Sequence, residues 1–137
     1  MILHMRREVT DWMSQAEADY KKAGVLQDSK YFDGVAFYTH QASEKAMKGL
    51  YLLVNNESAK SHSLVFLANE LGVPRELMSG IRELNPEYLI SRYPDIANGI
   101  PADNYDEEIG NRYLTTAKKV ISWVKARMEE LENSQDE

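Results

Sequence analysis

Apolar side chains recur every three or four residues along two long segments in the first half of the chain. This spacing places them on one face of an α-helix. In the first segment the apolar stripe consists of Val9, Trp12, Met13, Ala16, Tyr20 and Ala23. The pattern predicts one helix over about residues 6–23 that ends at Gly24. After a polar connection at residues 27–30, it predicts a second helix over about residues 31–54.

Shorter helices are predicted in the middle of the chain. A third helix starts near Ser61 or Ser63, either of which can cap its N-terminus, and stops at Gly72. Pro74 suits the first turn of a fourth helix. That helix ends near residues 85–86, and one further short turn follows it.

The last third of the chain predicts a loop followed by one long helix. Residues 91–104 contain two prolines and an Asn-Gly pair, so we expect a loop that no regular helix crosses. The final helix starts within residues 103–106, where acidic side chains favour a helix N-terminus. We expect a single domain over residues 1–132 and a frayed acidic tail at 133–137. With no strand signal, the pattern predicts an all-α, roughly antiparallel bundle with short inserted helices.

The second predicted helix has two distinct faces. Ala42, Ala46 and Gly49 lie in the middle of its core face, and such small residues allow a neighbouring helix to approach closely. The opposite face carries Phe37, His40, Gln41, Glu44, Lys48 and Tyr51. A purely solvated face does not need two aromatic rings, so we interpret this second face as a candidate interface or site.

Two interpretations of the polar residues on that face remain open. Glu44 and Lys48 are spaced four residues apart in the favourable order, which predicts an exposed ion pair worth about 0.3 to 0.5 kcal/mol. Alternatively, Gln41 and Lys48 line a polar cleft, with His40 as a titratable donor.

Two further segments contain candidate functional residues. His62 lies between two serines at a predicted helix start, where it acts either in capping and packing or in chemistry. Arg92 and Tyr93 precede Pro94 in the predicted loop. A guanidinium can clamp a phosphate and a ring can stack on a base, although Arg92 could equally serve as a structural salt-bridge partner.

Composition and charge narrow the classes of function. A chain of 137 residues with 43% hydrophobic residues forms about one globular domain. The absence of cysteine excludes disulfides, thiolate zinc sites and cysteine nucleophiles. The formal net charge of -6 argues against broad nonspecific coating of nucleic acid. No apolar run is long enough to span a bilayer and no signal region is evident, so we expect a cytoplasmic protein that does not enter membranes.

Common catalytic and cofactor motifs are missing. The seven glycines form neither a P-loop nor a dinucleotide-binding fingerprint. None of the three histidines follows a glutamate at the spacing of a helical di-iron site, and no zincin motif occurs. We therefore expect no metal and no cofactor.

Together these segments resemble the HEPN family, which consists of small all-α domains. The resemblance runs through Trp12, Ala16 and Asp19, residues 40–48 (HQASEKAMK), residues 61–64 (SHSL), residues 88–95 (YLISRYPD), Ala117 and residues 123–124. It covers nearly the whole chain and implies an up-and-down four-helix bundle that usually dimerises. HEPN domains are often encoded beside a minimal nucleotidyltransferase, as a two-component or toxin-antitoxin-like pair.

The resemblance also implies an activity that this sequence lacks in part. Many HEPN domains are metal-independent ribonucleases, with an arginine, four to six residues and then a histidine. After Arg92 the corresponding positions are Ala97, Asn98 and Gly99, so the histidine that would act as general acid or base is missing. We therefore expect a binding partner of a nucleotidyltransferase that is not itself an enzyme. The residues expected to bind the nucleotide are Gln41, Lys48, Arg92 and Tyr93.

Two alternatives remain. The first is a ribonuclease in which His40 or His62 works with Arg92 in place of the missing histidine. The second is a plain protein-interaction module. In each case we expect a homodimer that forms through aromatic side chains, namely Phe37, Tyr51 and either Trp12 or Trp123.

Overall fold

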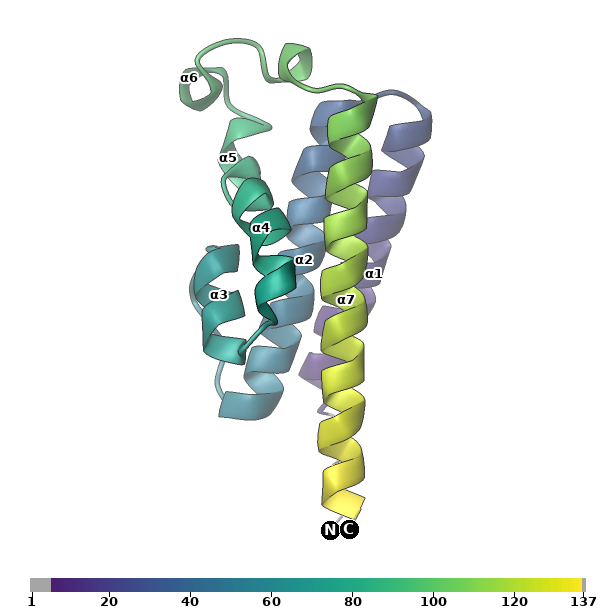
Figure 1. Cartoon of the computed structure of the whole chain (residues 1–137), viewed down its shortest axis with the longest axis vertical. Helices are drawn as coiled ribbons and strands as arrows, with labels where there is room; N and C mark the ends of the chain where they lie inside the picture. Colours follow the sequence, from purple (N-terminus) through teal and green to yellow (C-terminus); the bar gives the residue numbers. More distant parts are fainter. Residues whose placement is uncertain (1–5, 137) are drawn as a thin grey trace.

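The computed structural model describes residues 6–136, and its regular secondary structure over that range is helical. The body of the molecule is formed by long helical segments that run antiparallel (Figure 1). They are α1 (Arg7–Asp28), α2 (Phe32–Asn55), α4 (Arg75–Leu84) continued by α5 (Glu87–Ile90), and α7 (Glu107–Asp136). The prediction of an up-and-down four-helix bundle is confirmed.

A short helix, α3 (Leu64–Leu71), is inserted between α2 and α4 on the side of α2 that faces away from α1 (Figure 1). Ser63 is its N-cap, because the Ser63 hydroxyl accepts a hydrogen bond from the Phe66 amide at 3.1 Å. Ser61 is not the cap; its hydroxyl instead accepts from the Ser63 amide at 3.0 Å. Gly72 ends the helix in a left-handed conformation, as predicted.

The segment over residues 91–104 is more ordered than the predicted loop. It contains one helical turn, α6 (Pro94–Ala97), and a 3₁₀ turn, η1 (Pro101–Asn104). Each turn begins at a proline, because the fixed φ of proline suits the first position and its missing N–H is not needed there. The prolines therefore start short turns while still preventing one continuous helix.

The close packing of α1 on α2 rests on small residues. Ala42 and Ala46 are fully buried on the predicted core face of α2. A Cβ atom added to Gly49 would lie 3.1 Å from the Cβ of Trp12 and 3.5 Å from the carbonyl oxygen of Val9. Gly49 therefore allows α1 to approach α2 closely, as the helical wheel predicts.

The prediction that α1 ends at Gly24 is wrong, since the helix continues to Asp28. Its last turn is held by tertiary contacts: the side-chain amide of Gln27 donates to the carbonyl oxygen of Glu107 at 3.1 Å. A hydrogen bond contributes about 0.5 to 1.5 kcal/mol, which is comparable to the cost of about 1 kcal/mol for a glycine within a helix. The chain instead leaves the helix through Lys30, which has a φ of 66°.

The final helix, α7, begins where the sequence predicts. The Asp106 carboxylate caps it by accepting from the Ile109 amide at 2.9 Å. The helix extends through Asp136, beyond the predicted domain end at residue 132. Residue 137 lies outside the described residues, and fraying of residues 133–137 stays a prediction. Across residues 6–136, no helix is both long and apolar enough to cross a bilayer.

Candidate functional site

A row of polar residues on α2 lies beneath the segment that joins α2 to α3. Lys48 Nζ lies 2.7 Å from Glu44 Oε2, and His40 Nδ1 lies 3.7 Å from Glu44 Oε1. The side chains of Glu44 and Lys48 are only 6% and 9% exposed. The pair predicted from the spacing does form, but the prediction that it is exposed is wrong. It is a buried pair, and removing one partner of a buried pair strongly lowers the stability of the fold.

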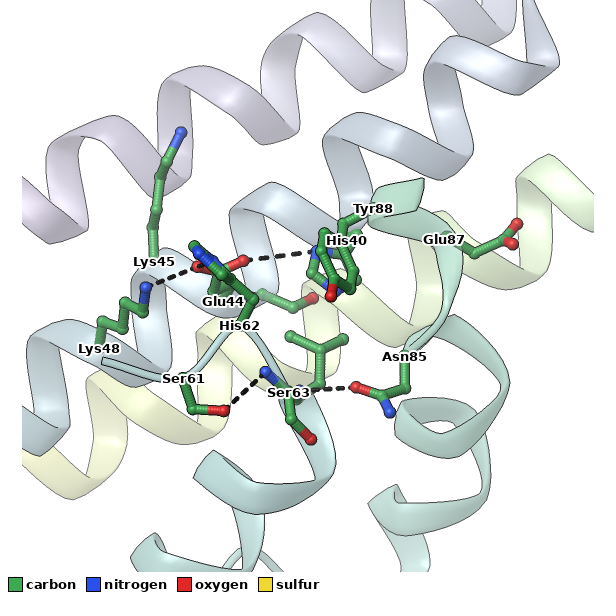
Figure 2. A network of polar contacts seen from close by, with 12 residues as sticks. His40, Glu44, Lys45, Lys48, Ser61, His62, Ser63, Asn85, Glu87 and Tyr88 are labelled. Carbon is green, nitrogen blue, oxygen red and sulfur yellow. Dashed lines mark hydrogen bonds and ion pairs between the residues drawn. The ribbon is translucent and has the colours of Figure 1, made fainter. Parts of the chain in front are cut away.

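His62 completes this group from outside α2. Its Nδ1 lies 2.9 Å from Glu44 Oε2, so that oxygen contacts both Lys48 and His62 (Figure 2). The His62 side chain is 62% exposed. An exposed imidazole held by a buried carboxylate resembles an acid-base pair more than a helix cap. Of the two interpretations of His62, capping and packing leaves its contact with Glu44 unexplained.

His40 occupies the opposite environment. Its side chain is fully buried, and neither ring nitrogen has a hydrogen-bond partner within the described residues. Burial lowers the pKa of His40 to about 4, although the charge of Glu44 opposes this shift. The ring is therefore neutral at pH 7. Because it is out of contact with solvent, the expectation that His40 is a titratable donor in an open cleft is wrong.

The ring of Tyr88 on α5 connects these histidines. Its centroid lies 5.2 Å from the His40 ring and 5.7 Å from the His62 ring. The backbone carbonyl of Tyr88 accepts a hydrogen bond from Arg92 Nε at 2.9 Å. The three catalytic candidates named from the sequence therefore all contact one residue, Tyr88.

Arg92 is held in place by rings as well as by this hydrogen bond. Its guanidinium carbon lies 4.5 Å from the centroid of Phe37 and 4.9 Å from that of Tyr93. Arg92 is exposed, and none of the carboxylates described lies within 4 Å of it. The alternative of a structural salt bridge is thus not what the structure shows. The side chain is fixed in orientation and points a cation at solvent.

A second buried group on α5 is Glu87, which lies near Tyr113 of α7. Glu87 is 4% exposed, and burial raises the pKa of its carboxyl. The neighbouring hydroxyl groups of Tyr105 and Tyr113 counteract part of that rise. Glu87 and Tyr88 point to different sides of α5, as Figure 2 shows. Glu87 of this short helix is therefore buried in the bundle, while the adjacent Tyr88 lies in the candidate site.

An open cavity of about 440 Å³ lies between the start of α3 and α5. His62 and Tyr88 line it together with Asn85, whose side-chain oxygen accepts from the Leu64 amide at 2.7 Å. Ile96 on α6 also lines it. The cavity therefore combines an imidazole, an aromatic ring and apolar side chains, and Arg92 is not among its lining residues.

The four residues expected to bind a nucleotide lie in different environments. Arg92 and Tyr93 are adjacent and exposed. Gln41 is half-buried on α2, one turn after Phe37. Lys48 is buried, with its amine on Glu44 and 5.8 Å from the ring centroid of Trp12. The structure therefore places Arg92 and Tyr93 together and assigns Lys48 to the buried pair.

The segment after Arg92 lacks the histidine of the family's catalytic motif, and Asn98 follows the end of α6. Asn98 is exposed and adopts a left-handed conformation with φ 56°. This is a conformation that asparagine accepts more readily than most residues. Its amide can donate a hydrogen bond but cannot exchange a proton at neutral pH. Within residues 6–136, moreover, no three acidic or histidine side chains are placed to hold a metal ion.

The aromatic residues expected at a dimer interface are half-buried. Phe37 is covered in part by Arg92, while Tyr51, Trp12 and Trp123 pack against the core. The homodimer stays a prediction.

Comparison with known proteins agrees with this architecture. A profile of the HEPN domain matches residues 9–128. The chain belongs to the HEPN family. Among solved structures it is similar to TT1696 from Thermus thermophilus, with a TM-score of 0.82 and 27% identity over 88% of this chain and 98% of that one. No curated protein matches the sequence significantly.

Two further structures are similar to this HEPN domain. ST0689, an archaeal HEPN homologue, has a TM-score of 0.76 and 30% identity over 89% of this chain and 98% of that one. A HEPN domain protein of Thermotoga maritima, TM0613, shares the fold with a TM-score of 0.70 at 24% identity, over 87% of this chain and 98% of that one. These likenesses cover almost the whole of each relative, so the matched unit is the complete bundle.

Sequence reasoning missed the central position of Tyr88. Tyr88 and Arg92 are four residues apart, a spacing that places them on one side of a helical turn. That spacing is the signal that could have found their contact. Contacts of Tyr88 with His40 and His62 join three distant segments, and no local pattern shows them.

Proposed function

We propose that this HEPN domain binds a nucleotide on the face formed by Arg92, Tyr93 and His62, as the partner of a minimal nucleotidyltransferase. The observation that carries the proposal is the fixed, exposed guanidinium of Arg92 between the rings of Phe37 and Tyr93. Among the hydrogen bonds of residues 6–136, Arg92 uses only its Nε, in the bond to the Tyr88 carbonyl. Its two terminal nitrogens are the donors that clamp a phosphate.

The surroundings of Arg92 suit the remaining parts of a nucleotide. The Tyr93 ring is 43% exposed and offers a surface on which a base can stack. His62 and the cavity of about 440 Å³ that it lines with Tyr88 provide hydrogen-bonding groups and room for further parts of the ligand. Because Arg92 is already held by two rings and one hydrogen bond, binding costs little further ordering of its side chain.

Titration calorimetry with ATP and with UMP tests the binding. Arg92→Ala is expected to weaken binding roughly 10- to 150-fold, the equivalent of one charged hydrogen-bonding contact. Arg82 is also exposed, but it lies on α4, so Arg82→Ala is the matched control and should bind as the wild type does. Absence of heat with either nucleotide at millimolar concentration would contradict the proposal.

The nucleotidyltransferase partner is proposed from membership of the HEPN family. A minimal nucleotidyltransferase gene beside the gene for this chain would support it, and co-expression of the two should give a complex that purifies as one species. A chain that never copurifies with such a neighbour would contradict this half of the proposal while leaving the nucleotide binding intact.

A ribonuclease is the second candidate, and the contact between His62 and Glu44 favours it. An exposed imidazole whose Nδ1 lies on a buried carboxylate has its other nitrogen directed away from that partner, as a general base requires. Buried His40 does not reach a substrate. RNA that is cleaved in the presence of a chelator by the wild type, but not by His62→Ala or Arg92→Ala, would establish this activity. Intact RNA over hours would exclude it.

A further inference from the structure

We infer that the groove between α1 and α7 is a docking surface for an acidic amphipathic helix of another protein. The two helices run antiparallel and side by side (Figure 1). An open cavity of about 250 Å³ lies between them, and its lining includes Tyr20, Lys21, Lys118 and Ile121. None of the residues that line it belongs to the proposed nucleotide site. The inference therefore goes beyond the proposed function and does not depend on it.

Lysine side chains border this groove on both helices. Lys21 and Lys118 are exposed, and among the side chains described over residues 6–134 no carboxylate lies within 4 Å of either amine. Lys125, by contrast, pairs with Glu17 where both line the same groove. The chain as a whole carries a net charge of -6, so two such cations at one cavity form a local exception. A carboxylate placed between them would offset their repulsion.

The lining of the groove also includes apolar surface. Tyr20 is half-buried and Ile121 is buried, so each presents part of its apolar side chain to the cavity. A cavity of about 150 Å³ admits a ligand the size of benzene, so this larger one admits a large apolar side chain. Val25 lies one helical turn beyond Lys21 and is 64% exposed. Its burial against a partner would remove further apolar surface from water.

Gly24 leaves space on the same side of α1. It lies four residues after Tyr20 and three after Lys21, a spacing that places the three residues on one side of the helix. A Cβ atom added at Gly24 would meet no atom within 4 Å, so packing within the fold does not require glycine there. Glycine within a helix nevertheless costs about 1 kcal/mol relative to alanine. The missing side chain allows the backbone of a partner helix to approach α1 closely.

These features together specify the chemistry of the partner. A helix that docks in a groove places apolar side chains there at intervals of three and four residues. Carboxylates beside those side chains would reach the amines of Lys21 and Lys118, while the partner backbone would occupy the space over Gly24. An anionic membrane would attract the lysines, but a flat surface does not enter a groove between two helices. The partner is therefore an acidic helix with an apolar stripe.

Fluorescence anisotropy with a synthetic peptide of about four helical turns tests this docking surface. The peptide carries leucine at every third or fourth position and glutamate beside each leucine. Wild-type protein should bind it and should not bind a matched peptide with serine in place of leucine. The double variant Lys21→Glu/Lys118→Glu should bind it at least about tenfold more weakly, because like charges then face each other. Lys119→Glu is the matched control, because Lys119 is exposed beside Lys118 but does not line the groove.

Two further measurements distinguish a docked helix from simple attraction between opposite charges. Gly24→Leu should weaken binding at least about tenfold while its circular dichroism spectrum matches that of the wild type, because the added side chain fills the space over α1. A peptide with lysine in place of glutamate should bind the double variant but not the wild type.

Several outcomes would overturn the inference. They are no binding of the acidic peptide by the wild type, equal binding of the leucine and serine peptides, and unchanged binding by the double variant or by Gly24→Leu. Binding of vesicles that contain phosphatidylglycerol, without binding of the peptide, would assign the lysines to a membrane instead. UMP binding should be the same in the wild type and in these variants, so failure of the docking surface leaves the proposed nucleotide site intact.

Discussion

Replacing Glu44 by glutamine should destabilise the protein far more than removing an ordinary surface carboxylate. Glutamine keeps the shape of the side chain but removes its charge. The change leaves the Lys48 side chain, which is only 9% exposed, no longer opposite a carboxylate. The same substitution weakens the contact with His62, which shares the oxygen that Lys48 uses.

The expected loss follows from the burial of the pair. Losing one partner of a buried ion pair costs about 3 to 5 kcal/mol, because the remaining charge stays desolvated. An exposed pair at the same helical spacing is worth only about 0.3 to 0.5 kcal/mol. The structure places the contact between Glu44 and Lys48, at 2.7 Å and with both side chains under 10% exposed, in the first class.

Urea denaturation followed by circular dichroism measures the effect. For an m-value of about 2 kcal/mol per molar, the midpoint of Glu44→Gln should fall by about 1.5 to 2.5 M. Arg112 contacts two carboxylates, Glu83 and Glu108. Glu108→Gln removes the one at the same helical spacing, which is 83% exposed, and should change stability by less than about 0.5 kcal/mol. Adding Lys48→Met to Glu44→Gln should restore much of the loss. A Glu44→Gln midpoint equal to that of the control would show that the pair contributes no more than an exposed one.

Three further predictions concern the bundle. Because burial lowers the pKa of His40 from 6.5 to about 4, the unfolded chain binds a proton over that range that the folded chain does not. The free energy of unfolding, measured in urea titrations, should therefore fall by about 2 kcal/mol from pH 7.5 to pH 5. If the free energy of unfolding of His40→Leu fell by the same amount over this pH range, the prediction would be contradicted. Gly49→Val should lower the free energy of unfolding by about 1 to 3 kcal/mol, because the larger side chain crowds Trp12. Gly24→Ala should raise it by about 0.5 to 1 kcal/mol, because no atom lies within 4 Å of the added Cβ. Thermal melts that reverse this order would contradict the helix assignments. Light scattering should give twice the 15.7 kDa of one chain, and the monomer mass would exclude the expected dimer.

The helices could be predicted because their signals are local. A stripe with a period of 3.6 residues, a serine cap before α3 and acidic side chains before α7 each act within a few residues. The end of α1 could not be predicted in this way. Gly24 is a stop signal by itself, but the contact between Gln27 and Glu107 joins residues 80 positions apart and keeps the last turn helical.

The sequence predicts which residues belong to the candidate site better than it predicts how deeply they are buried. The spacing of Glu44 and Lys48 predicts their contact, and the structure confirms it. Its burial depends on the segment around His62, which returns to α2 only in the folded chain. The stacking of Arg92 on Phe37 likewise joins two segments with no shared local pattern. For the same reason, the pKa of His40 could not be inferred from its neighbours in the sequence.

The most direct test of the nucleotide site is to titrate isotope-labelled protein with UMP and follow its nuclear magnetic resonance spectrum. We expect shift changes at the Arg92 side-chain N–H groups and at the amides of Tyr88 and His62. Changes confined to the lysine-lined groove between α1 and α7, where Lys21 and Lys118 border a cavity of about 250 Å³, would contradict it.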